Sequence, residues 1–595
     1  MICKPLNFAL KKARLWFLLP FFAAALFVRS GCAHPDAPLV PICVIQGSGF
    51  TSPRVGETLR AQGVVSADFD DTSLDGFFIQ TANCDSDPAT SDGIFVALDE
   101  GVNLVEVGDF VEVRAMVAEF YGQTRLETNP ADVQIIASGR DPPPAVELQP
   151  PFENEQARSY FEALEGMRVS LDSGKVIGPT DARGNTWLVR SDLGIPRVFD
   201  DDPAGTGEII MVGSEGLFAP NPAKVGDTFQ GLDGVLDYIL GAYKILLLTG
   251  VSQPSSATLH PGAEAASLPG FTFGSCNLDN LFDIVDDPET EDPVPSPPEY
   301  QRKLDKLALL IRDGLGEPDF LAVQEAENET VLQHLAARVE LTVDYDVIWQ
   351  NGPDRRGIDV GLLYNSEKVV ITGFEAHQGC TALVDGLGPD GNGDVQAPQN
   401  ALTCDTDGDG ILDGNRLFSR PPLLVQMTVD LGGGENLPLW ALVNHWKSKR
   451  EDTRTQEHTL PRRLEQAAFV AALTDEIERA HPGAGVIVLG DLNDTFASQP
   501  LARLAQARLW NATRHIAREE RYTYIYRGVS QTLDHVFVSS ALAVNWVAVQ
   551  PVHLGADYPA IYESQPGVYR ASDHDPLLVR YTLLPYHTFL PLISR

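Results

Sequence analysis

Short apolar runs that alternate with turn residues dominate the chain between residues 40 and 255. Residues 40–138 contain runs such as GFFIQT, GIFVAL and DFVEVRAMVAEF. This rhythm predicts short strands and is typical of a small β-barrel or sandwich. Residues 155–255 repeat it, and VGDTF here echoes VGDFV in the first region, each followed by a strand-like run. The pattern therefore predicts two related all-β modules, joined by the Pro-rich linker GRDPPPAVELQPP.

The pattern changes after a second polar linker, which ends at Gly270. Strand-like runs such as FTFGSC, DFLAVQE, GVIVLGD and DPLLVRYTL now alternate with longer stretches such as YQRKLDKLALLIRDG and RRLEQAAFVAALTDEIERA. In these stretches apolar residues recur at three- and four-residue steps, as in helices with one buried face. Residues 268–585 are therefore predicted to form one mixed α/β domain, and residues 586–595 are a short apolar tail.

Residues 1–33 have the layout of a secretory signal peptide. Lys and Arg residues precede the apolar core LWFLLPFFAAALFV, and small residues follow it up to Ala33. The core is too short and too closely followed by Arg29 to predict a membrane span. Lipid attachment at Cys32 is the alternative to plain cleavage. We therefore expect a secreted, extracellular protein, either free or associated with the cell surface.

Composition adds a constraint on the partner. The chain has 595 residues, 44% of them hydrophobic, and a formal net charge of −38, so it is long enough for several globular domains. Such an acidic chain does not resemble a protein that coats nucleic acid, which would usually be basic. Net charge bears on solubility and association rather than on fold, and it leaves the oligomeric state open.

Five cysteines remain after the predicted leader. In an oxidising compartment they predict two disulfides and one spare thiol. Cys380 and Cys404 bracket a polar, Gly-rich loop, and Cys43 and Cys84 lie in one predicted module, so these are the two expected pairs. Cys276 falls inside an apolar strand pattern and is expected to be a buried free thiol.

Polar residues gather where the strands of the α/β domain end. The stretch GVIVLGDLNDT runs from a buried strand pattern into Asp491, Asn493 and Asp494. Alone, it would predict a turn, with Asp494 as its cap, because Gly, Asn and Asp favour turns. Similar residues recur in FTFGSCNLDNLF, DFLAVQEAEN, ALVNHWKSK, TLDHVFVS and ASDHDPLLV. Ligand sites of open α/β sheets cluster at strand ends, so the joint occurrence favours a functional site.

The residue types indicate the chemistry of this site. Carboxylates and amides without paired Cys or His spacing favour a hard, oxygen-seeking cation (Mg²⁺, Mn²⁺ or Ca²⁺) over zinc. Neither a GxSxG nucleophile motif nor a GxxxxGK phosphate loop occurs. Two histidines with carboxylate neighbours supply a general base and a general acid. A divalent cation with two acid–base groups fits hydrolysis of a phosphate ester by activated water.

Together, the segments NLDNLF, QEAEN, FSRPPLLVQM, NHWKSK, GDLND, TLDHVF and SDHDP resemble the endonuclease/exonuclease/phosphatase superfamily. Within it, they look most like the secreted bacterial extracellular nucleases, which carry β modules of the oligonucleotide-binding (OB) type ahead of the catalytic domain. The resemblance implies a four-layer sandwich of two mixed β-sheets flanked by helices. It also implies an enzyme dependent on Mg²⁺ or Mn²⁺ that hydrolyses nucleic acid, with DNA as the expected substrate and RNA as a further one.

The resemblance assigns the metal and water-binding roles by motif. Glu325 would be the principal metal ligand, with Asn277 and Asp573 nearby. Asp491 and Asn493 would orient or activate the attacking water and contact the phosphate.

The remaining catalytic roles are carried over in the same way. His574 would serve as base or would polarise the phosphate, with Asp534 holding its imidazole. His445 would lie across the scissile group as acid or phosphate contact, and Asp359 is a candidate to orient it. Arg420 matches a family arginine that neutralises phosphate charge.

The insertion CDTDGDGILDGN departs from the motif pattern. Asp405, Asp407, Asp409 and Asp413 stand at oxygen-ligand spacing, with a glycine at the sharp turn. It is not an EF-hand, because Arg416 stands where the twelfth position would need Glu. We predict a structural Ca²⁺ loop of another type, against the alternative of a bare acidic surface turn.

Two other functions compete with a nuclease. The same residues would permit a phosphatase or phosphodiesterase acting on lipid or small phosphoesters. A secreted binding protein with an inert last domain is the other alternative, although the complete motif set argues against inertness. The negative net charge opposes nucleic-acid binding, and basic residues near the motifs are expected to offset it locally: Lys447, Lys449, Arg450, Arg454, Arg462 and Arg463 around the His445 strand, and Arg355, Arg356, Arg416 and Arg420 elsewhere. Endo- or exonuclease mode is left open.

Overall fold

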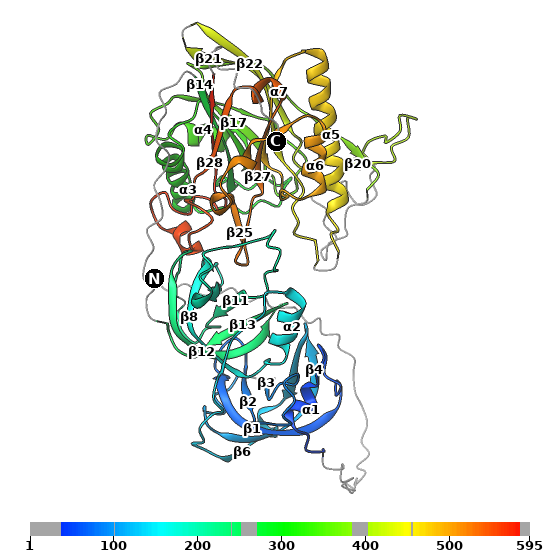
Figure 1. The fold of residues 1–595 in the computed structure, drawn as a ribbon, viewed down its shortest axis with the longest axis vertical. Helices are drawn as coiled ribbons and strands as arrows, with labels where there is room; N and C mark the ends of the chain where they lie inside the picture. Colours follow the sequence, from blue (N-terminus) through cyan, green and yellow to red (C-terminus); the bar gives the residue numbers. More distant parts are fainter. Residues whose placement is uncertain are drawn as a thin grey trace, which may run out of the picture.

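The computed structural model describes residues 37–583, except 100, 220, 240, 252–269, 384–402, 433 and 454–455. The predicted leader, the apolar tail, most of the second linker and Arg454 lie outside the described residues. Figure 1 shows an elongated molecule, with the N-terminal strands at one end and the α/β part at the other. Within the described ranges, no helix has the length and apolarity needed to cross a bilayer.

The first sheet is a closed ring of strands. β1 pairs with β2 on one side and with β4 on the other, so the order β1-β2-β3-β5-β4 returns to its start, and β6 extends it beside β4. Alternate side chains of β1 are buried inside the ring, as the two-residue period of a strand requires. Its elements are α1 (Ile42–Gln46), β1 (Thr58–Phe69), β2 (Gly76–Gln80), β3 (Gly93–Leu98), β4 (Phe110–Phe120), β5 (Gln123–Thr128) and β6 (Val133–Ala137).

The second sheet repeats the same strand order. The order β8-β9-β11-β13-β12 closes through the β12–β8 pair, and β7 extends it beside β8. In both rings the third and fifth strands pair in parallel. The elements are β7 (Val146–Glu147), α2 (Asn154–Glu162), β8 (Arg168–Gly178), β9 (Thr186–Arg190), β11 (Ile210–Gly213), β12 (Thr228–Ile239) and β13 (Ala242–Leu247).

The VGD segment that recurs in the sequence forms the same turn in both rings. Each VGD precedes the fourth strand of its ring, and the glycines, Gly108 and Gly226, have φ values of 95° and 90°. The following carboxylates, of Asp109 and Asp227, accept a hydrogen bond from the backbone N–H three residues earlier, at 3.1 and 3.0 Å. The short repeat is therefore a turn that leads into the corresponding strand of each ring.

The α/β part contains two six-stranded mixed sheets that share a core. One has the order β16-β17-β15-β14-β29-β28 and the other β18-β21-β22-β23-β27-β24. Apolar side chains from both sheets form one buried cluster between them. Two further clusters pack α3 and α4 against the outer face of the first sheet, and α5 and α6 against that of the second. The helical periodicity seen in the sequence therefore corresponds to helices that each bury one face on a sheet.

The bounds of these elements follow chain order. The first sheet comprises β14 (Gly270–Leu281), β15 (Phe320–Ala326), β16 (Tyr345–Trp349), β17 (Asp359–Asn365), β28 (Trp546–Pro551) and β29 (Leu577–Thr582). The second comprises β18 (Val369–Ala376), β21 (Leu423–Gly432), β22 (Glu435–His445), β23 (Gly485–Asp491), β24 (Trp510–Asn511) and β27 (Asp534–Val538). The helices are α3 (Pro297–Leu309), continued by a π-turn (Leu310–Gly314), α4 (Glu329–Ala336), α5 (Leu460–Ala480), α6 (Gln499–Gln506) and α7 (Ser540–Ala543).

Small sheets and disulfides complete the fold. The pairs Cys43–Cys84 and Cys380–Cys404 form disulfides, and Cys276 is a buried free thiol, as the sequence predicts. The second disulfide closes the insertion that carries the small sheet β19 (Cys380–Thr381) and β20 (Asn415–Arg416). A three-stranded sheet joins the second ring to the α/β part through β10 (Val198–Phe199), β25 (Tyr524–Tyr526) and β26 (Val529–Gln531).

Candidate functional site

Three adjacent strands of the second α/β sheet bring their polar ends together. His445 on β22 lies opposite Asp491 on β23, and Asp491 lies opposite Asp534 on β27. Gly490 permits this arrangement, because its φ is 133° and a Cβ there would lie 2.0 Å from the carbonyl oxygen of Asn444. The glycine of GDLND is therefore required by the close approach of two strands, whereas the carboxylate after it points to the site.

The facing sheet contributes residues from irregular strand ends. Asn277 on β14 lies opposite Gln324 on β15, and the pairing register of β15 with β17 then shifts at Glu325. Glu325 has a φ of 62°, and Asp279 and Asn280 have φ values of 53° and 56°. A bulge of this kind re-aims a side chain, and strained backbone of this type clusters at functional sites.

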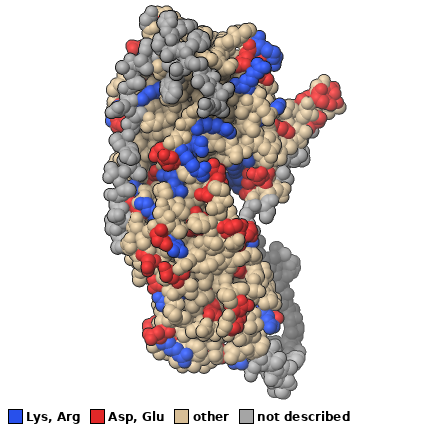
Figure 2. Space-filling model, in the orientation of Figure 1, with Lys and Arg blue, Asp and Glu red and all other residues tan. Residues whose placement is uncertain are grey.

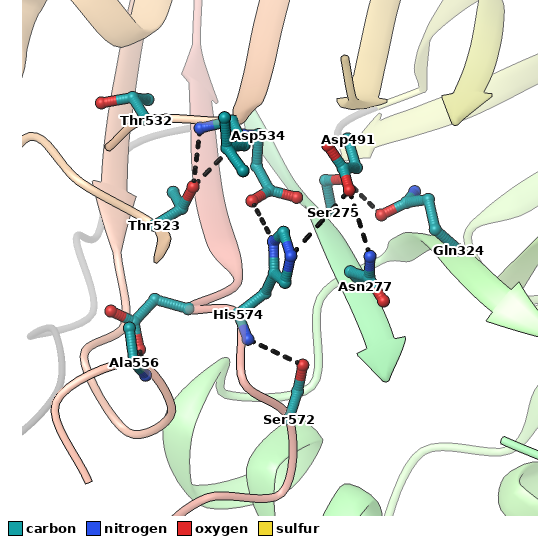
Figure 3. Close-up of polar contacts among 12 residues, drawn as sticks. Ser275, Asn277, Gln324, Asp491, Thr523, Thr532, Asp534, Ala556, Ser572 and His574 are labelled. Carbon is teal, nitrogen blue, oxygen red and sulfur yellow. Dashed lines mark hydrogen bonds and ion pairs between the residues drawn. The ribbon is translucent and has the colours of Figure 1, made fainter. Parts of the chain in front are cut away.

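Side chains from both sheets converge on one carboxylate oxygen, Oδ2 of Asp491 (Figure 3). The Nδ2 of Asn277 donates to it at 3.2 Å, and the Nε2 atoms of His445 and His574 lie 3.6 and 3.9 Å away. Glu325 lies beside them, with its Oε1 3.3 Å from Asn277 Nδ2 and 3.7 Å from His445 Nε2. The residues predicted from separate motifs thus form one buried polar cluster.

His574 is held by Asp534, as the motif comparison implies. Its Nδ1 lies 2.8 Å from Asp534 Oδ2, and the ring of Tyr524 lies over it with centroids 4.8 Å apart. Burial opposes protonation, but Asp534, Asp491 and Asp573 outweigh it and raise the pKa of His574 well above its usual value. The imidazole is therefore positively charged at neutral pH, with its Nε2 directed at Asp491.

His445 has the opposite character. Burial, followed by the charges of Arg420 and Arg356, lowers the pKa of His445 well below its usual value, so this imidazole is neutral. Its Nδ1 has no hydrogen-bond partner among the described residues. Asp359, the candidate to orient this ring, instead accepts a hydrogen bond from the backbone N–H of Gly352 at 2.7 Å. The structure therefore does not pair Asp359 with His445.

The carboxyl groups of Asp491 and Asp573 both have raised pKa values. Burial, with Asp534 and Glu325, raises the pKa of Asp491 to about 7, although the charge of His574 opposes this. Burial and the neighbouring carboxylates likewise raise the pKa of Asp573 to about 6. A divalent cation would relieve such crowding, and carboxylate and amide oxygens are donors that Mg²⁺ prefers. The carboxylates of Glu325 and Asp573 therefore fit the predicted metal, whereas Asn277 turns its Nδ2 toward Glu325 and its Oδ1 accepts the backbone N–H of Asp279 at 2.9 Å.

Arg420 reaches the site from the side of His445 but is fully buried. One guanidinium nitrogen lies 2.6 Å from Asp354 Oδ2, and another donates to the carbonyl oxygen of Trp446 at 3.0 Å. Asn493 binds the same carbonyl oxygen through its Nδ2 at 3.1 Å, and its backbone N–H donates to Asp491 Oδ1 at 2.8 Å. Arg420 and Asn493 thus share a contact at the edge of the cluster.

Three of the six basic residues predicted around the His445 strand are paired with carboxylates within the fold rather than free to attract phosphate. Lys447 is buried and lies 2.7 Å from Glu451, and Arg463 is buried 2.9 Å from Asp494. Lys449 lies 2.9 Å from the same Asp494. Asp494 accepts the backbone N–H of Thr495 at 3.1 Å, in agreement with the predicted turn cap, and it also binds these two cations, so their charges are neutralised within the fold.

The insertion places three of the four predicted Ca²⁺ ligands together. Carboxylate oxygens of Asp405, Asp407 and Asp409 lie within 4.8 Å of one another. Asp413 is engaged elsewhere, accepting hydrogen bonds from the backbone N–H and hydroxyl of Thr406 at 2.8 and 2.7 Å. The predicted ligand set is thus reduced to three carboxylates.

Several residues of the cluster were not predicted. Asp279 lies inside the NLDNLF motif, and its Oδ2 is 3.4 Å from Lys303 Nζ on α3. Tyr524 and Arg570 come from segments without any motif, and Arg570 influences the pKa of Asp573. The NLDNLF motif could have indicated Asp279. Only the folded chain brings Lys303, Tyr524 and Arg570 to the site.

Family comparison agrees with this geometry. The Endonuclease/Exonuclease/phosphatase family matches residues 274–574, just over half of the chain. The chain therefore belongs to this family, whose members are hydrolases of phosphoester bonds that generally use divalent metals such as Mg²⁺. A domain of unknown function (DUF8508) matches residues 129–256. No curated protein matches the chain.

Solved structures similar to this chain include three distant examples. An endonuclease/exonuclease/phosphatase from Bacteroides vulgatus is 17% identical, covering 53% of this chain and 99% of its own, with a TM-score of 0.33. A humanized D. rerio TDP2 is 16% identical, covering 52% and 98%, with a TM-score of 0.32. The human Nocturnin catalytic domain, with bound sulfate, is 15% identical, covering 53% and 96%, with a TM-score of 0.32. These similarities do not bear on substrate or mechanism.

Proposed function

We propose that this protein is a secreted, divalent-metal-dependent nuclease that hydrolyses phosphodiester bonds of DNA, with RNA as a further substrate. The observation that carries the proposal is the convergence of Asn277, His445 and His574 on Asp491 Oδ2, beside Glu325. This arrangement places a carboxylate, a charged imidazole and a neutral imidazole around one small space. Such a set suits attack of water on a phosphodiester with acid–base assistance.

The opposite electrostatics of the two histidines support a division of labour. The raised pKa of His574 favours a charged imidazole that binds a phosphate oxygen, rather than the base that was the other possibility for this residue. Asp491, with a pKa of about 7, is the better base for the attacking water. His445, kept neutral, contacts the phosphate from the opposite side as a hydrogen-bonding group.

Glu325, Asn277 and Asp573 would hold the catalytic cation. Asn277 and Asn280 already orient the carboxylate of Glu325, through Nδ2 at 3.3 Å and the backbone N–H at 2.9 Å. When bound, Mg²⁺ or Mn²⁺ would supply charge neutralisation at the phosphate and promote ionisation of a bound water. Asn277 would offer its Oδ1 to the cation only after its amide turns, because Nδ2 now faces Glu325 and Oδ1 accepts the backbone N–H of Asp279 at 2.9 Å.

The architecture and the insertion carry two finer proposals. We infer that the two closed rings are OB-type modules, a proposal supported by their shared strand order, and that the two sheets with their covering helices are the four-layer sandwich. We also infer that Asp405, Asp407 and Asp409 bind a structural Ca²⁺ that orders the disulfide-closed insertion.

The test is a cleavage assay with the full mature chain. Plasmid DNA, single-stranded DNA, RNA and a panel of lipid and small phosphoesters are incubated with Mg²⁺ or with EDTA. We expect cleavage of DNA that requires Mg²⁺ and that falls at least about 10³-fold in Glu325→Ala and His574→Ala, because each removes a group acting in the transition state.

Controls separate this proposal from its competitors. Glu289→Ala replaces an exposed carboxylate outside the cluster and should retain wild-type cleavage. Preferential hydrolysis of the lipid or small phosphoesters would replace the nuclease by a phosphatase or phosphodiesterase. Cleavage that persists in EDTA or in both active-site variants would refute the mechanism.

A further inference from the structure

A cleft of about 630 Å³ separates the second ring from the β25–β26 hairpin of the α/β part. One wall comes from the ring and includes Arg183 and Trp187, and the other comes from the hairpin and includes Tyr526 and Arg527. This volume lies within the range of ligand-binding pockets. In Figure 1, β25 projects from the α/β part toward the ring that contains β8 and β11.

The cleft lies beside the candidate catalytic histidine, from which Tyr524 separates it. Tyr524 lines the cleft, and its ring also lies over the imidazole of His574. Arg570 lines it too, and its charge acts on the pKa of Asp573. Tyr524 and Arg570 therefore belong both to the cleft and to the surroundings of the cluster around Asp491.

The side chains of the cleft combine aromatic rings with positive charge. Tyr526 is 51% exposed, and Trp187 is partly exposed on the opposite wall. Arg183 and Arg527 are exposed, and within the described ranges neither has a carboxylate at ion-pair distance. They differ in this from the buried, paired cations near His445. The acidic lining residues are already engaged: Glu215 pairs with Lys244, and Asp181 accepts bonds from the backbone of Arg183 and Asn185.

The two walls are held together by buried contacts. Val198 and Phe199 of β10 pair in parallel with β26, so one small sheet includes strands from both sides. Arg197 lies between the walls, 2.9 Å from Asp557 Oδ1 and 2.9 Å from the hydroxyl of Tyr522, with its guanidinium 3.7 Å above that ring. An arginine held by a carboxylate and an aromatic face thus ties the second ring to the α/β part.

We propose that this cleft binds single-stranded nucleic acid and guides it into the active site. The proposal rests on the nuclease function and specifies its substrate. Exposed aromatic rings bind bases only when the base faces are accessible, as in a single strand, and arginines pair with the backbone phosphates. A duplex offers no free base faces, so it would not use Tyr526 and Trp187. Figure 2 shows Lys and Arg side chains interspersed with Asp and Glu on the lower half of the α/β part, in a chain that as a whole is acidic.

The experiment measures how binding and KM depend on strand length. Fluorescence anisotropy with single-stranded oligonucleotides of increasing length is recorded in EDTA, and KM is measured in Mg²⁺ for the same strands and for a dinucleotide. In Tyr526→Ala and in the double variant Tyr526→Ala/Arg527→Ala, the Kd and KM of long strands should rise about tenfold or more, whereas those of a dinucleotide should change far less. The advantage of long strands over short ones should therefore shrink.

Matched substitutions in the first ring provide the control. Tyr121→Ala and Arg114→Ala replace an exposed tyrosine and a half-exposed arginine far along the chain, and they should keep the wild-type length dependence. Equal changes for the dinucleotide and the long strand, or no change for either, would overturn the proposal. Weaker binding of duplex but not of single strands would overturn it too. Cleft-dependent binding without cleavage by the wild type would instead refute the nuclease function alone.

Discussion

His553 lies in the α/β part between Tyr522 and the loop that carries the candidate catalytic histidine, and it is a sensitive probe of the contacts there. Its Nδ1 lies 2.8 Å from Asp575 Oδ2 and its Nε2 3.3 Å from Glu520 Oε2. Its ring stacks on Tyr522 with centroids 4.0 Å apart, and Tyr522 in turn contacts Arg197 of the second ring. Burial alone would lower the pKa of His553, but Asp575 and Glu520 outweigh it and raise the pKa to about 9.

Because the pKa of His553 is raised in the folded state, this residue stabilises the fold more at low pH than at high pH. The folded-state pKa of about 9 exceeds the ordinary value of 6.5, so the folded protein binds the proton more tightly than the unfolded chain. The stabilisation is fully present below pH 6.5 and is lost as the pH rises through about 9. It amounts to roughly 3 kcal/mol at pH 6, about 2 kcal/mol at pH 7.5 and almost nothing above pH 10.

The assay compares the wild type with His553→Gln by urea denaturation at pH 6, 7.5 and 10, followed by tryptophan fluorescence. The free energy of unfolding lost in the variant should be about 3 kcal/mol larger at pH 6 than at pH 10. His481→Gln serves as the control, because His481 is exposed and stacks on Trp440 without an ion pair among the described residues. A loss that is the same at pH 6 and pH 10 would refute the raised pKa and the ion pairs behind it.

Three further predictions follow from other contacts. Asp534→Asn should lower kcat about 10³- to 10⁴-fold with little change in Tm, because the imidazole loses its orienting charge; near-normal kcat in steady-state assays would contradict this. Lys306→Met should lower the free energy of unfolding by about 3 kcal/mol in urea, because the Lys306 ammonium lies 2.6–3.1 Å from four carbonyl oxygens of loop 562–569, to which its three N–H groups donate. An unchanged midpoint would contradict this. Asp407→Asn with Asp409→Asn should abolish a Ca²⁺-dependent rise in Tm in thermal scans, and a wild-type rise would refute the Ca²⁺ loop.

The amino-acid sequence alone predicted the alternation of strands and helices, and the motif resemblance predicted most of the residues that meet at the strand ends. Periods of two and of three to four residues report directly on which side of an element is buried, and this is a local property. The motif around Asp491 was predictable for the same reason, since a buried strand followed by Gly, Asp and Asn is visible in a single short segment. The two disulfides also match the pairs predicted from the positions of the cysteines in the sequence.

The tertiary structure decided the properties that depend on distant segments. The φ of 62° at Glu325 arises from a shift in pairing between β15 and β17, and no local pattern marks it. The opposite pKa shifts of His574 and His445 come from carboxylates and arginines on separate strands. From the sequence, Arg463 was expected to contribute positive charge near the site, but its side chain is buried beside Asp494 and is therefore not at the surface.

The cleft beside Tyr526 illustrates the same division. Tyr524, Tyr526 and Arg527 look like an ordinary hairpin in the sequence, and Trp187 lies more than three hundred residues earlier. Only the packing of the second ring against this hairpin, through Arg197 and β10, makes them face one cleft. Local periodicity determines the elements, whereas the relation between elements depends on buried contacts between residues far apart in the chain, and those contacts exist only in the folded protein.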